Sequence, residues 1–288
     1  MFEQLGLIGC GLMGGSFALA LKRAGMVRRV VGYSKSPSTT ERARQLGVID
    51  VEVPSALQAV SGSDLVLLAV PVAATEATLK AIRHGLAPGV LLMDVGSTKS
   101  DVVAAARRVL GDRLGAFVPA HPIAGKETAG VNHADPDLYV SRQVILTPLD
   151  GTPARLVDKA RQVWESVGSH VRVMSPEVHD ATFAAVSHLP HLLAFAYMNG
   201  LEAQPEGAGY IARGGPGFRD FTRIAAGDPS MWRDILLANQ VDVLAQARHF
   251  RAGLAALENA IAAGDAAALE ALIRQASAAR AGWHMSSK

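Results

Sequence analysis

Residues 5–15 read Leu5-Gly6-Leu7-Ile8-Gly9-Cys10-Gly11-Leu12-Met13-Gly14-Gly15, an apolar run that passes directly into a glycine-rich turn. The run predicts a buried strand, and a helix from about Met13 to Gly25 follows. In Gly9-x-Gly11-x-x-Gly14, the first glycine permits the tight turn, the second lets backbone approach a pyrophosphate, and the third lets helix and strand pack closely. The phosphates would bind at the free N–H groups and positive dipole of the helix. This stretch therefore predicts a dinucleotide-binding unit.

The residues after the second predicted strand, 29–33, bear on the choice of dinucleotide. About twenty residues past the third glycine, NAD-binding proteins place an acidic side chain on the ribose 2′-hydroxyl. This chain has Ser34 and Lys35 there, which would accept a 2′-phosphate, so NADP is favoured over NAD. The alternative is that residues 34–38 are only a polar turn before the next helix. The expected cofactor-binding residues are Gly9, Gly11, Leu12, Met13, Gly14, Ser34, Lys35, Val70 and Pro71.

Strands and helices continue to alternate beyond this unit. Apolar runs at residues 65–70, 90–94, 143–147 and 170–174 predict strands, with helical segments among them. Such alternation indicates a parallel sheet covered on both faces, with ligands at the carboxyl ends of its strands. The strand signals stop near Met174. We therefore expect an α/β, Rossmann-type dinucleotide-binding domain at residues 1–174 and an all-α domain at residues 175–288.

Two predicted strand ends carry candidate catalytic residues. Ser97 follows the strand at 90–94 and could face the cleft, although Thr98-x-x-Asp101 also resembles a capping box in which Ser97 or Thr98 begins the next helix. His121 follows the next strand. A histidine there could accept a proton from a substrate hydroxyl near neutral pH as hydride leaves the same carbon. The alternative for a lone loop histidine is simple solvation.

The helical half holds further polar candidates. His179 and Asp180 are adjacent, but the chain lacks the histidine and carboxylate spacings of a zinc site, so no metal is expected. His188 and His191 share one helix face, near Pro190. We expect one of these histidines to be buried and hydrogen-bonded for structure and the other to face the cleft.

Two arginines of the same half are spaced for anion binding. Arg219 and Arg223 stand at i and i+4 on a predicted helix, where their planar groups could clamp a carboxylate. A solvated helix face with Asp220 as the partner is an equal alternative. Asp228, followed by proline, then marks the start of the next helix, with Trp232 in its first turn.

Composition excludes several classes of protein. The 288 residues are 49% hydrophobic and 19% charged, with a net charge of +2, which suits two soluble globular domains without the basic patch of a nucleic-acid-binding protein. Glu3 stands where a signal peptide has basic residues, and no apolar run approaches the roughly 18 residues of a membrane span. A cytoplasmic protein with no membrane partner is expected. Cys10, the single cysteine, excludes an internal disulfide.

Five motifs, in this order and over nearly the whole chain, resemble the prephenate dehydrogenases of tyrosine biosynthesis, a family that includes enzymes preferring arogenate. They are Gly9-x-Gly11-x-x-Gly14-Gly15-Ser16, Asp94-x-Gly96-Ser97-x-Lys99, His121-Pro122-Ile123-Ala124-Gly125, Ser187-His188-Leu189-Pro190-His191 and Phe218-Arg219-Asp220-Phe221-Thr222-Arg223.

The resemblance implies an oxidative decarboxylation, of prephenate to 4-hydroxyphenylpyruvate or of arogenate to tyrosine. Hydride leaves the ring carbon that bears the hydroxyl, the ring carboxylate departs as carbon dioxide, and a phenol forms. His121 would take the hydroxyl proton with support from Ser97, and Arg223 would hold a substrate carboxylate. The further substrate residues implied are His191, Arg219 and Trp232. The resemblance also implies a homodimer formed through the helical half, with substrate bound between the domains.

Two other functions remain open at this point. Another two-domain NADP-dependent dehydrogenase, of the β-hydroxyacid type, would place a catalytic lysine on a helix of the junction, whereas the histidine motifs and paired arginines fit a dicarboxylate better. A redox sensor that binds a dinucleotide without turnover would tolerate loss of His121. It would also leave Arg219 and Arg223 without a role.

Overall fold

The computed structural model describes residues 1–126 and 128–283, and its first domain is built on a five-stranded parallel sheet. The strand order is β3-β2-β1-β4-β5, and every pairing within it is parallel. This is the Rossmann-type sheet expected from the glycine-rich turn. The strands are β1 (Phe2–Ile8), β2 (Val27–Tyr33), β3 (Val51–Glu52), β4 (Leu65–Leu68) and β5 (Leu91–Asp94).

Helices cover both faces of this sheet, as the alternation of strands and helices predicts. They are α1 (Leu12–Arg23), α2 (Pro37–Gln45), α3 (Ala56–Val60), α4 (Thr75–Ile82), α5 (Ser100–Val109) and α6 (Ala154–Ser166), with short 3₁₀ turns η1 (Val72–Ala74), η2 (Gly111–Ala116) and η3 (Val131–His133).

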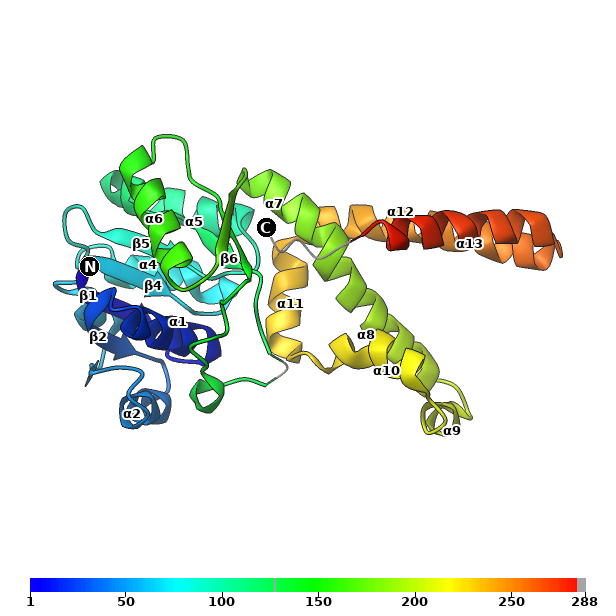
Figure 1. Cartoon of the computed structure of the whole chain (residues 1–288), viewed down its shortest axis with the longest axis horizontal. Helices are drawn as coiled ribbons and strands as arrows, with labels where there is room; N and C mark the ends of the chain where they lie inside the picture. The colour runs from blue at the N-terminus through cyan, green and yellow to red at the C-terminus, as the bar shows by residue number, and fades with distance from the viewer. Residues whose placement is uncertain (127, 284–288) are drawn as a thin grey trace.

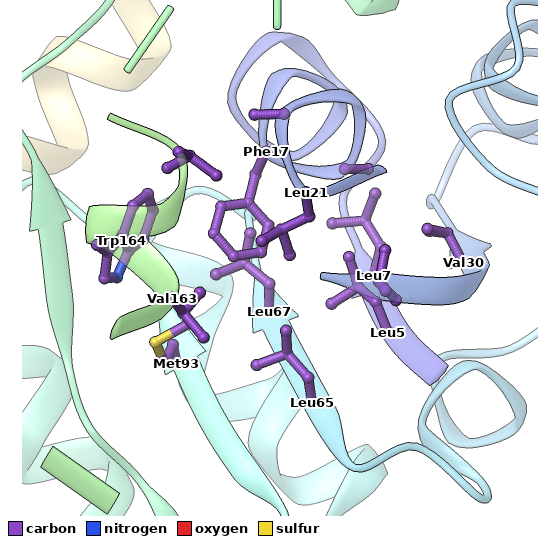
Figure 2. Close-up of a cluster of buried hydrophobic side chains, with 14 of the residues drawn as sticks. Leu5, Leu7, Phe17, Leu21, Val30, Leu65, Leu67, Met93, Val163 and Trp164 are labelled. Carbon is purple, nitrogen blue, oxygen red and sulfur yellow. The ribbon is translucent and has the colours of Figure 1, made fainter. Parts of the chain in front are cut away.

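The two faces of the sheet form two separate hydrophobic clusters. Leu65 and Leu67 of β4 pack on one face with Phe17 of α1 and Trp164 of α6, as Figure 2 shows. Alternate residues of β4, Val66 and Leu68, belong to the cluster on the other face, under α3, α4 and α5. Side chains of a strand alternate between its two faces, so a strand buried on both faces must be apolar throughout.

The last three strands form a second, smaller sheet. It has the order β6-β7-β8, with β6 (Ala120–Pro122) antiparallel to β7 (Gln143–Leu146) and β7 parallel to β8 (His170–Val173). Strand β6 therefore differs from the strands of the large sheet in pairing antiparallel with its neighbour. The chain passes along the edge of the large sheet, where the N–H of Val118 donates to the carbonyl of Leu92 at 2.8 Å, and then turns away. Pro119 and Pro122 lack N–H donors, which keeps β6 short and at an edge.

The second domain is helical, and in the described residues after Val173 no strand occurs. Its elements are α7 (Pro176–Phe183), the π-helical turn η4 (Ala184–His188), α8 (Leu189–Glu202), α9 (Gly207–Ile211), α10 (Pro216–Thr222), the 3₁₀ turn η5 (Arg223–Ala226), α11 (Pro229–Ala238), α12 (Gln240–Ala262) and α13 (Ala266–Ala281).

Figure 1 shows how this domain meets the first. Helices α7 and α11 lie nearest the sheets, whereas α12 and α13 run side by side and project away from them. Helix α11 starts as predicted: the Asp228 carboxylate accepts the N–H of Met231, and a proline occupies the first turn. In the described ranges, no helix is both long and apolar enough to cross a membrane.

Candidate active site

The glycine-rich turn joins β1 to α1 in the geometry that its sequence predicts. Gly9 has a φ of +97°, and a Cβ there would lie 2.1 Å from the carbonyl oxygen of Ala69. A Cβ at Gly14 would lie 2.0 Å from the carbonyl oxygen of Gly9. A Cβ at Gly11, in contrast, would meet no atom within 4 Å. Helix α1 begins at Leu12 without a side-chain cap, so its N-terminal N–H groups face an open surface that fits a pyrophosphate.

Ser34 lies against this turn. Its hydroxyl accepts the backbone N–H of Cys10 at 2.8 Å, which ties the end of β2 to the glycine-rich turn. The hydroxyl keeps its own proton for donation. The neighbouring Lys35 is exposed. A serine and a lysine therefore border the place where the second strand of a dinucleotide fold meets the ribose.

The ends of β4 and β5 bring two more predicted segments to the same edge of the sheet. Val70 and Pro71 follow β4, and Pro71 precedes η1. Ser97 follows β5 and is half-buried. Helix α11 of the second domain packs against η1, so this edge of the sheet faces the helical domain.

A buried ion pair fixes the strand that carries His121. The Lys99 ammonium lies 2.5 Å from Asp94 Oδ2, and both side chains are almost completely buried. Lys99 Nζ also donates to the carbonyl of Ala120 at 2.7 Å, and Asp94 Oδ1 accepts the N–H of Ala120 at 3.0 Å. The ion pair thus hydrogen-bonds both the backbone N–H and the carbonyl of Ala120, the residue before His121. Removing one member of such a buried pair typically costs about 3–5 kcal/mol.

His121 is half-buried and packs against the helical domain, so simple solvation does not describe it. Its Nδ1 lies 2.8 Å from Nε2 of His179, on α7, and the ring of Phe183 packs edge-on with centroids 4.9 Å apart. Burial lowers the pKa of His121 well below its ordinary value of 6.5, and the charges of His179 and Lys99 act in the same direction. The imidazole is therefore neutral near pH 7, the form that can accept a proton.

Asp180 completes this group. Its Oδ1 lies 2.8 Å from His179 Nδ1, and its two oxygens accept the N–H groups of Lys99 and Ser100, each at 2.8 Å. Burial raises the pKa of Asp180, but the hydrogen bonds from His179 and Ser100 outweigh burial and hold that pKa below its ordinary 3.8.

Asp180 also overturns the predicted capping box. Helix α5 begins at Ser100, and its N-cap residue, Lys99, makes no side-chain cap. The cap comes instead from a carboxylate 80 residues further along the chain. Ser97 and Thr98 therefore lie in the loop before the helix and do not cap it.

One of the two paired histidines, His188, is buried and hydrogen-bonded, as the sequence predicts. His188 is buried, and its Nδ1 accepts from the Asn239 amide at 3.1 Å. His191 is half-buried; its Nδ1 donates to the carbonyl of Ser187 at 2.8 Å, and its ring stacks on Trp232 with centroids 3.6 Å apart. The stacked pair forms an aromatic surface on the helical side of the domain junction.

Arg219 and Arg223 stand four residues apart on continuous helical backbone, as predicted, because the N–H of Arg223 donates to the carbonyl of Arg219. Helix α10 ends at Thr222, and Arg223, with a helical φ of −48° and ψ of −42°, begins the tighter turn η5. Arg223 acts on His191, whose pKa is lowered first by burial and further by the Arg223 charge. The Arg219 side chain is 74% exposed, and its Nε lies 3.0 Å from Asp220. Arg223 therefore lies close enough to His191 to affect its pKa, whereas Arg219 is exposed and paired with Asp220.

The sequence interpretation missed the residues that support His121. The spacing of His179 and Asp180 bears only on a metal site, and no local pattern singles out Phe183 or Asn239. Two adjacent polar residues on a helix that is otherwise rich in buried positions are a signal of a hydrogen-bonded group. Within residues 1–126 and 128–283, no cluster of three His, Cys, Asp or Glu side chains could hold a metal ion.

A glycine-rich turn at the edge of a Rossmann-type sheet, in a domain whose half-buried His121 is held against a helical domain, defines a dinucleotide-dependent oxidoreductase of two domains. The chain belongs to the prephenate dehydrogenase family. The model described as "Prephenate dehydrogenase, nucleotide-binding domain" matches residues 17–173, and that described as "Prephenate dehydrogenase, dimerization domain" matches residues 175–275.

Individual relatives agree with this assignment. The cyclohexadienyl dehydrogenase of Zymomonas mobilis is 37% identical over 92% of this chain and 90% of its own length. The crystal structure of prephenate dehydrogenase from Aquifex aeolicus, in complex with hydroxyphenyl propionate and NAD+, is 37% identical and superposes with a TM-score of 0.89 over 97% of each chain. Arogenate dehydrogenase from Synechocystis is 27% identical, with a TM-score of 0.82, over 96% of this chain and 99% of that one. These relatives support prephenate or arogenate dehydrogenase activity over the hydroxyacid dehydrogenase and sensor alternatives.

Proposed function

We propose that this enzyme oxidatively decarboxylates prephenate or arogenate, with His121 as the general base. The observation that carries the proposal is the placement of the His121 imidazole, which lies 2.8 Å from His179 and follows the Ala120 peptide that Asp94 and Lys99 anchor. A neutral imidazole can take the proton of the ring hydroxyl as the carbon–oxygen double bond begins to form. Ser97, at the end of β5, supplies a hydroxyl on the same edge of the sheet.

The aromatic surface and Arg223 suit the rest of the substrate. We propose that the substrate ring lies against His191 and Trp232 and that Arg223 binds a carboxylate, since a guanidinium pairs with a carboxylate through two hydrogen bonds. Arg219 contributes at most long-range electrostatic attraction from its exposed position. Departure of the ring carboxylate as carbon dioxide leaves the electrons in the ring, and aromatisation drives the step.

The cofactor is proposed to be NADP in preference to NAD. Gly9, Gly11 and Gly14 with the N–H groups of Leu12 and Met13 would hold the pyrophosphate, and Val70 and Pro71 would border the nicotinamide side of the sheet edge. Ser34 and Lys35 would hold a 2′-phosphate. Position 34 carries no acidic side chain that would repel this phosphate. When bound, the dinucleotide accepts the hydride. The same surface accepts NAD with fewer contacts.

A homodimer through the helical domain is also part of the proposal. Apolar side chains on the projecting helices are exposed, among them Leu244 and Ile261 of α12 and Ile273 of α13. Such a surface on a soluble protein marks an interaction site, and the matched family model describes this region as a dimerization domain. We further propose that residues 1–174 and 175–288 act as separate domains, and that the enzyme works in the cytoplasm, where nicotinamide dinucleotides are available.

The stoichiometry of the products tests this function. Purified enzyme with prephenate or arogenate should release one carbon dioxide for each reduced dinucleotide formed. Reduced dinucleotide without carbon dioxide would point to a simple hydroxy-acid oxidation and would contradict the proposal. The same reaction with His84→Asn, at an exposed histidine of the first domain, serves as the control for histidine replacement in general.

A further inference from the structure

The hydrogen-bonded row of Asp180, His179 and His121 has one consistent arrangement of protons. Ionised Asp180 can only accept hydrogen bonds, and its oxygens already accept the N–H groups of Lys99 and Ser100. His179 Nδ1, 2.8 Å from Asp180 Oδ1, must therefore carry a proton. Burial lowers the pKa of His179 more than Asp180 raises it, so the ring is neutral and its Nε2 has a free lone pair.

The proton position on His121 follows from that on His179. His121 Nδ1 lies 2.8 Å from His179 Nε2, and a hydrogen bond between them requires one donor. Since His179 Nε2 has no proton, His121 Nδ1 must donate. A neutral imidazole carries one N–H, so the remaining nitrogen of His121, Nε2, is left as a proton acceptor.

We propose that His179 and Asp180 are positioning residues that hold the proton of His121 on Nδ1 and thereby make Nε2 the base. The inference rests on the proposed function for the role of Nε2, but the proton arrangement itself does not depend on it. In the reaction, the O–H bond of the substrate breaks and an Nε2–H bond forms on His121. The positive charge that develops on His121 is stabilised through His179 by the Asp180 carboxylate, which need not take up a proton.

Two other features of the site favour this role over a purely structural one. Phe183 packs against both imidazole rings, with centroids 4.9 Å from His121 and 4.5 Å from His179, and so fixes their relative orientation. Asp180 belongs to the helical domain but caps α5 of the dinucleotide-binding domain. The carboxylate that sets the proton on His121 is therefore itself held by hydrogen bonds from the other domain.

The proton positions can be measured without substrate. Long-range ¹H–¹⁵N spectra of the full-length enzyme labelled with [¹⁵N]histidine, at slightly alkaline pH, report which ring nitrogen carries the proton. The spectrum of His121→Asn assigns the His121 signals. We expect Nδ1–H on both His121 and His179 in the unmodified protein. His191, whose Nδ1 donates to Ser187 outside the row, is the internal reference.

Two substitutions at His179 separate positioning from packing. In His179→Gln the amide oxygen can still accept from His121 Nδ1, whereas the similarly sized leucine of His179→Leu cannot. We expect His179→Leu to allow the Nε2–H form of His121 and to lower kcat by about 100- to 10,000-fold with little change in KM. His179→Gln should restore the Nδ1–H form and recover at least about tenfold of that loss.

Either measurement can overturn the proposal. A proton on Nε2 of His121 in the unmodified enzyme would contradict it, even if neither His179 variant folds. Equal kcat values for His179→Gln and His179→Leu would contradict it as well. If His179 served only for packing, both substitutions would lower kcat to the same extent. Failure of the proposed function appears differently, as absence of turnover in a protein whose His121 still carries its proton on Nδ1.

Discussion

The Asp180 carboxylate, on α7, accepts a 2.8 Å hydrogen bond from the backbone N–H of Lys99 at the start of α5, although 81 residues separate them. Replacing a helix-capping aspartate with alanine costs about 0.5–2 kcal/mol, and the buried His179 N–H left without its acceptor adds about 1–3 kcal/mol. Asp180→Ala should therefore lower the free energy of unfolding by about 2–4 kcal/mol in urea titrations and also lower kcat. Asp265→Ala removes the cap of α13, far from the site, and is the matched control. It should cost only about 1 kcal/mol and leave kcat unchanged. Equal effects of the two variants would contradict a special role for Asp180.

The local features of the fold could be predicted from the sequence. Gly9 and Gly14 are needed because backbone atoms occupy the space of a side chain, and Asp228 begins α11 through a bond to Met231, three residues away. In each case the sequence signal and its structural cause lie within a few residues or in a well-known strand–turn–helix unit. The Rossmann-type fold and the family assignment followed from such signals, and both are confirmed.

The long-range features could not be predicted in this way. Asp94 and Lys99 hydrogen-bond the backbone of Ala120, and Asp180 caps α5. These partners are far apart in the sequence, so the spacing of neighbouring residues does not reveal the contacts. The pairing of β6, β7 and β8 in a separate sheet likewise depends on tertiary contacts that the sequence of each strand does not specify. The helical spacing of Arg219 and Arg223 could be predicted, but the exposure of Arg219 and the effect of Arg223 on His191 depend on how η5 packs against α8.

Arg223 should determine substrate affinity. Arg223→Gln keeps a polar side chain but removes the charge that would bind a carboxylate, and charge-assisted hydrogen bonds contribute about 1.5–3 kcal/mol. We expect KM for the substrate to rise by about 10- to 150-fold, while the dissociation constant of the cofactor stays the same. Arg219→Gln, at an exposed arginine paired with Asp220, is the control and should change KM less than about threefold. An unchanged KM in Arg223→Gln would remove Arg223 from the substrate site.

Position 34 should control the choice of dinucleotide. In Ser34→Asp the carboxylate can still accept the N–H of Cys10, so the turn is kept, but it would repel a 2′-phosphate and bind a ribose hydroxyl. We expect the ratio of kcat/KM for NADP to that for NAD to fall at least about tenfold, which corresponds to about 1.4 kcal/mol. Ser55→Asp, at a serine that caps α3, tests the same exchange elsewhere and should leave the ratio unchanged. If the ratio is also unchanged in Ser34→Asp, residues 34–38 are only a turn.

Buried histidines should make stability fall in acid. Burial lowers the pKa of His188 to about 4 from its ordinary 6.5, so the unfolded chain binds a proton between these values that the folded protein does not. Folding stability is therefore full above about pH 6.5 and is lost as the pH falls toward 4. His188 alone should remove about 2 kcal/mol between about pH 7 and pH 5.

The variant His188→Asn isolates this effect, because its amide oxygen can still accept from Asn239 but does not titrate in this range. Urea titrations at both pH values should show a loss about 2 kcal/mol smaller in the variant than in the unmodified protein, whatever its absolute stability. An identical loss in both proteins would show that His188 is not held neutral.

The most direct test of the central claim is the appearance of the reduced-nicotinamide absorbance when the purified enzyme is given prephenate or arogenate with either NAD or NADP. We predict turnover in at least one of the four combinations, fastest with NADP, and a kcat about 100- to 10,000-fold lower in His121→Asn, with cofactor binding retained. No absorbance change in any of the four combinations, with cofactor binding intact, would contradict the proposed dehydrogenase activity. A fully active His121→Asn enzyme would contradict the role of His121 as the base.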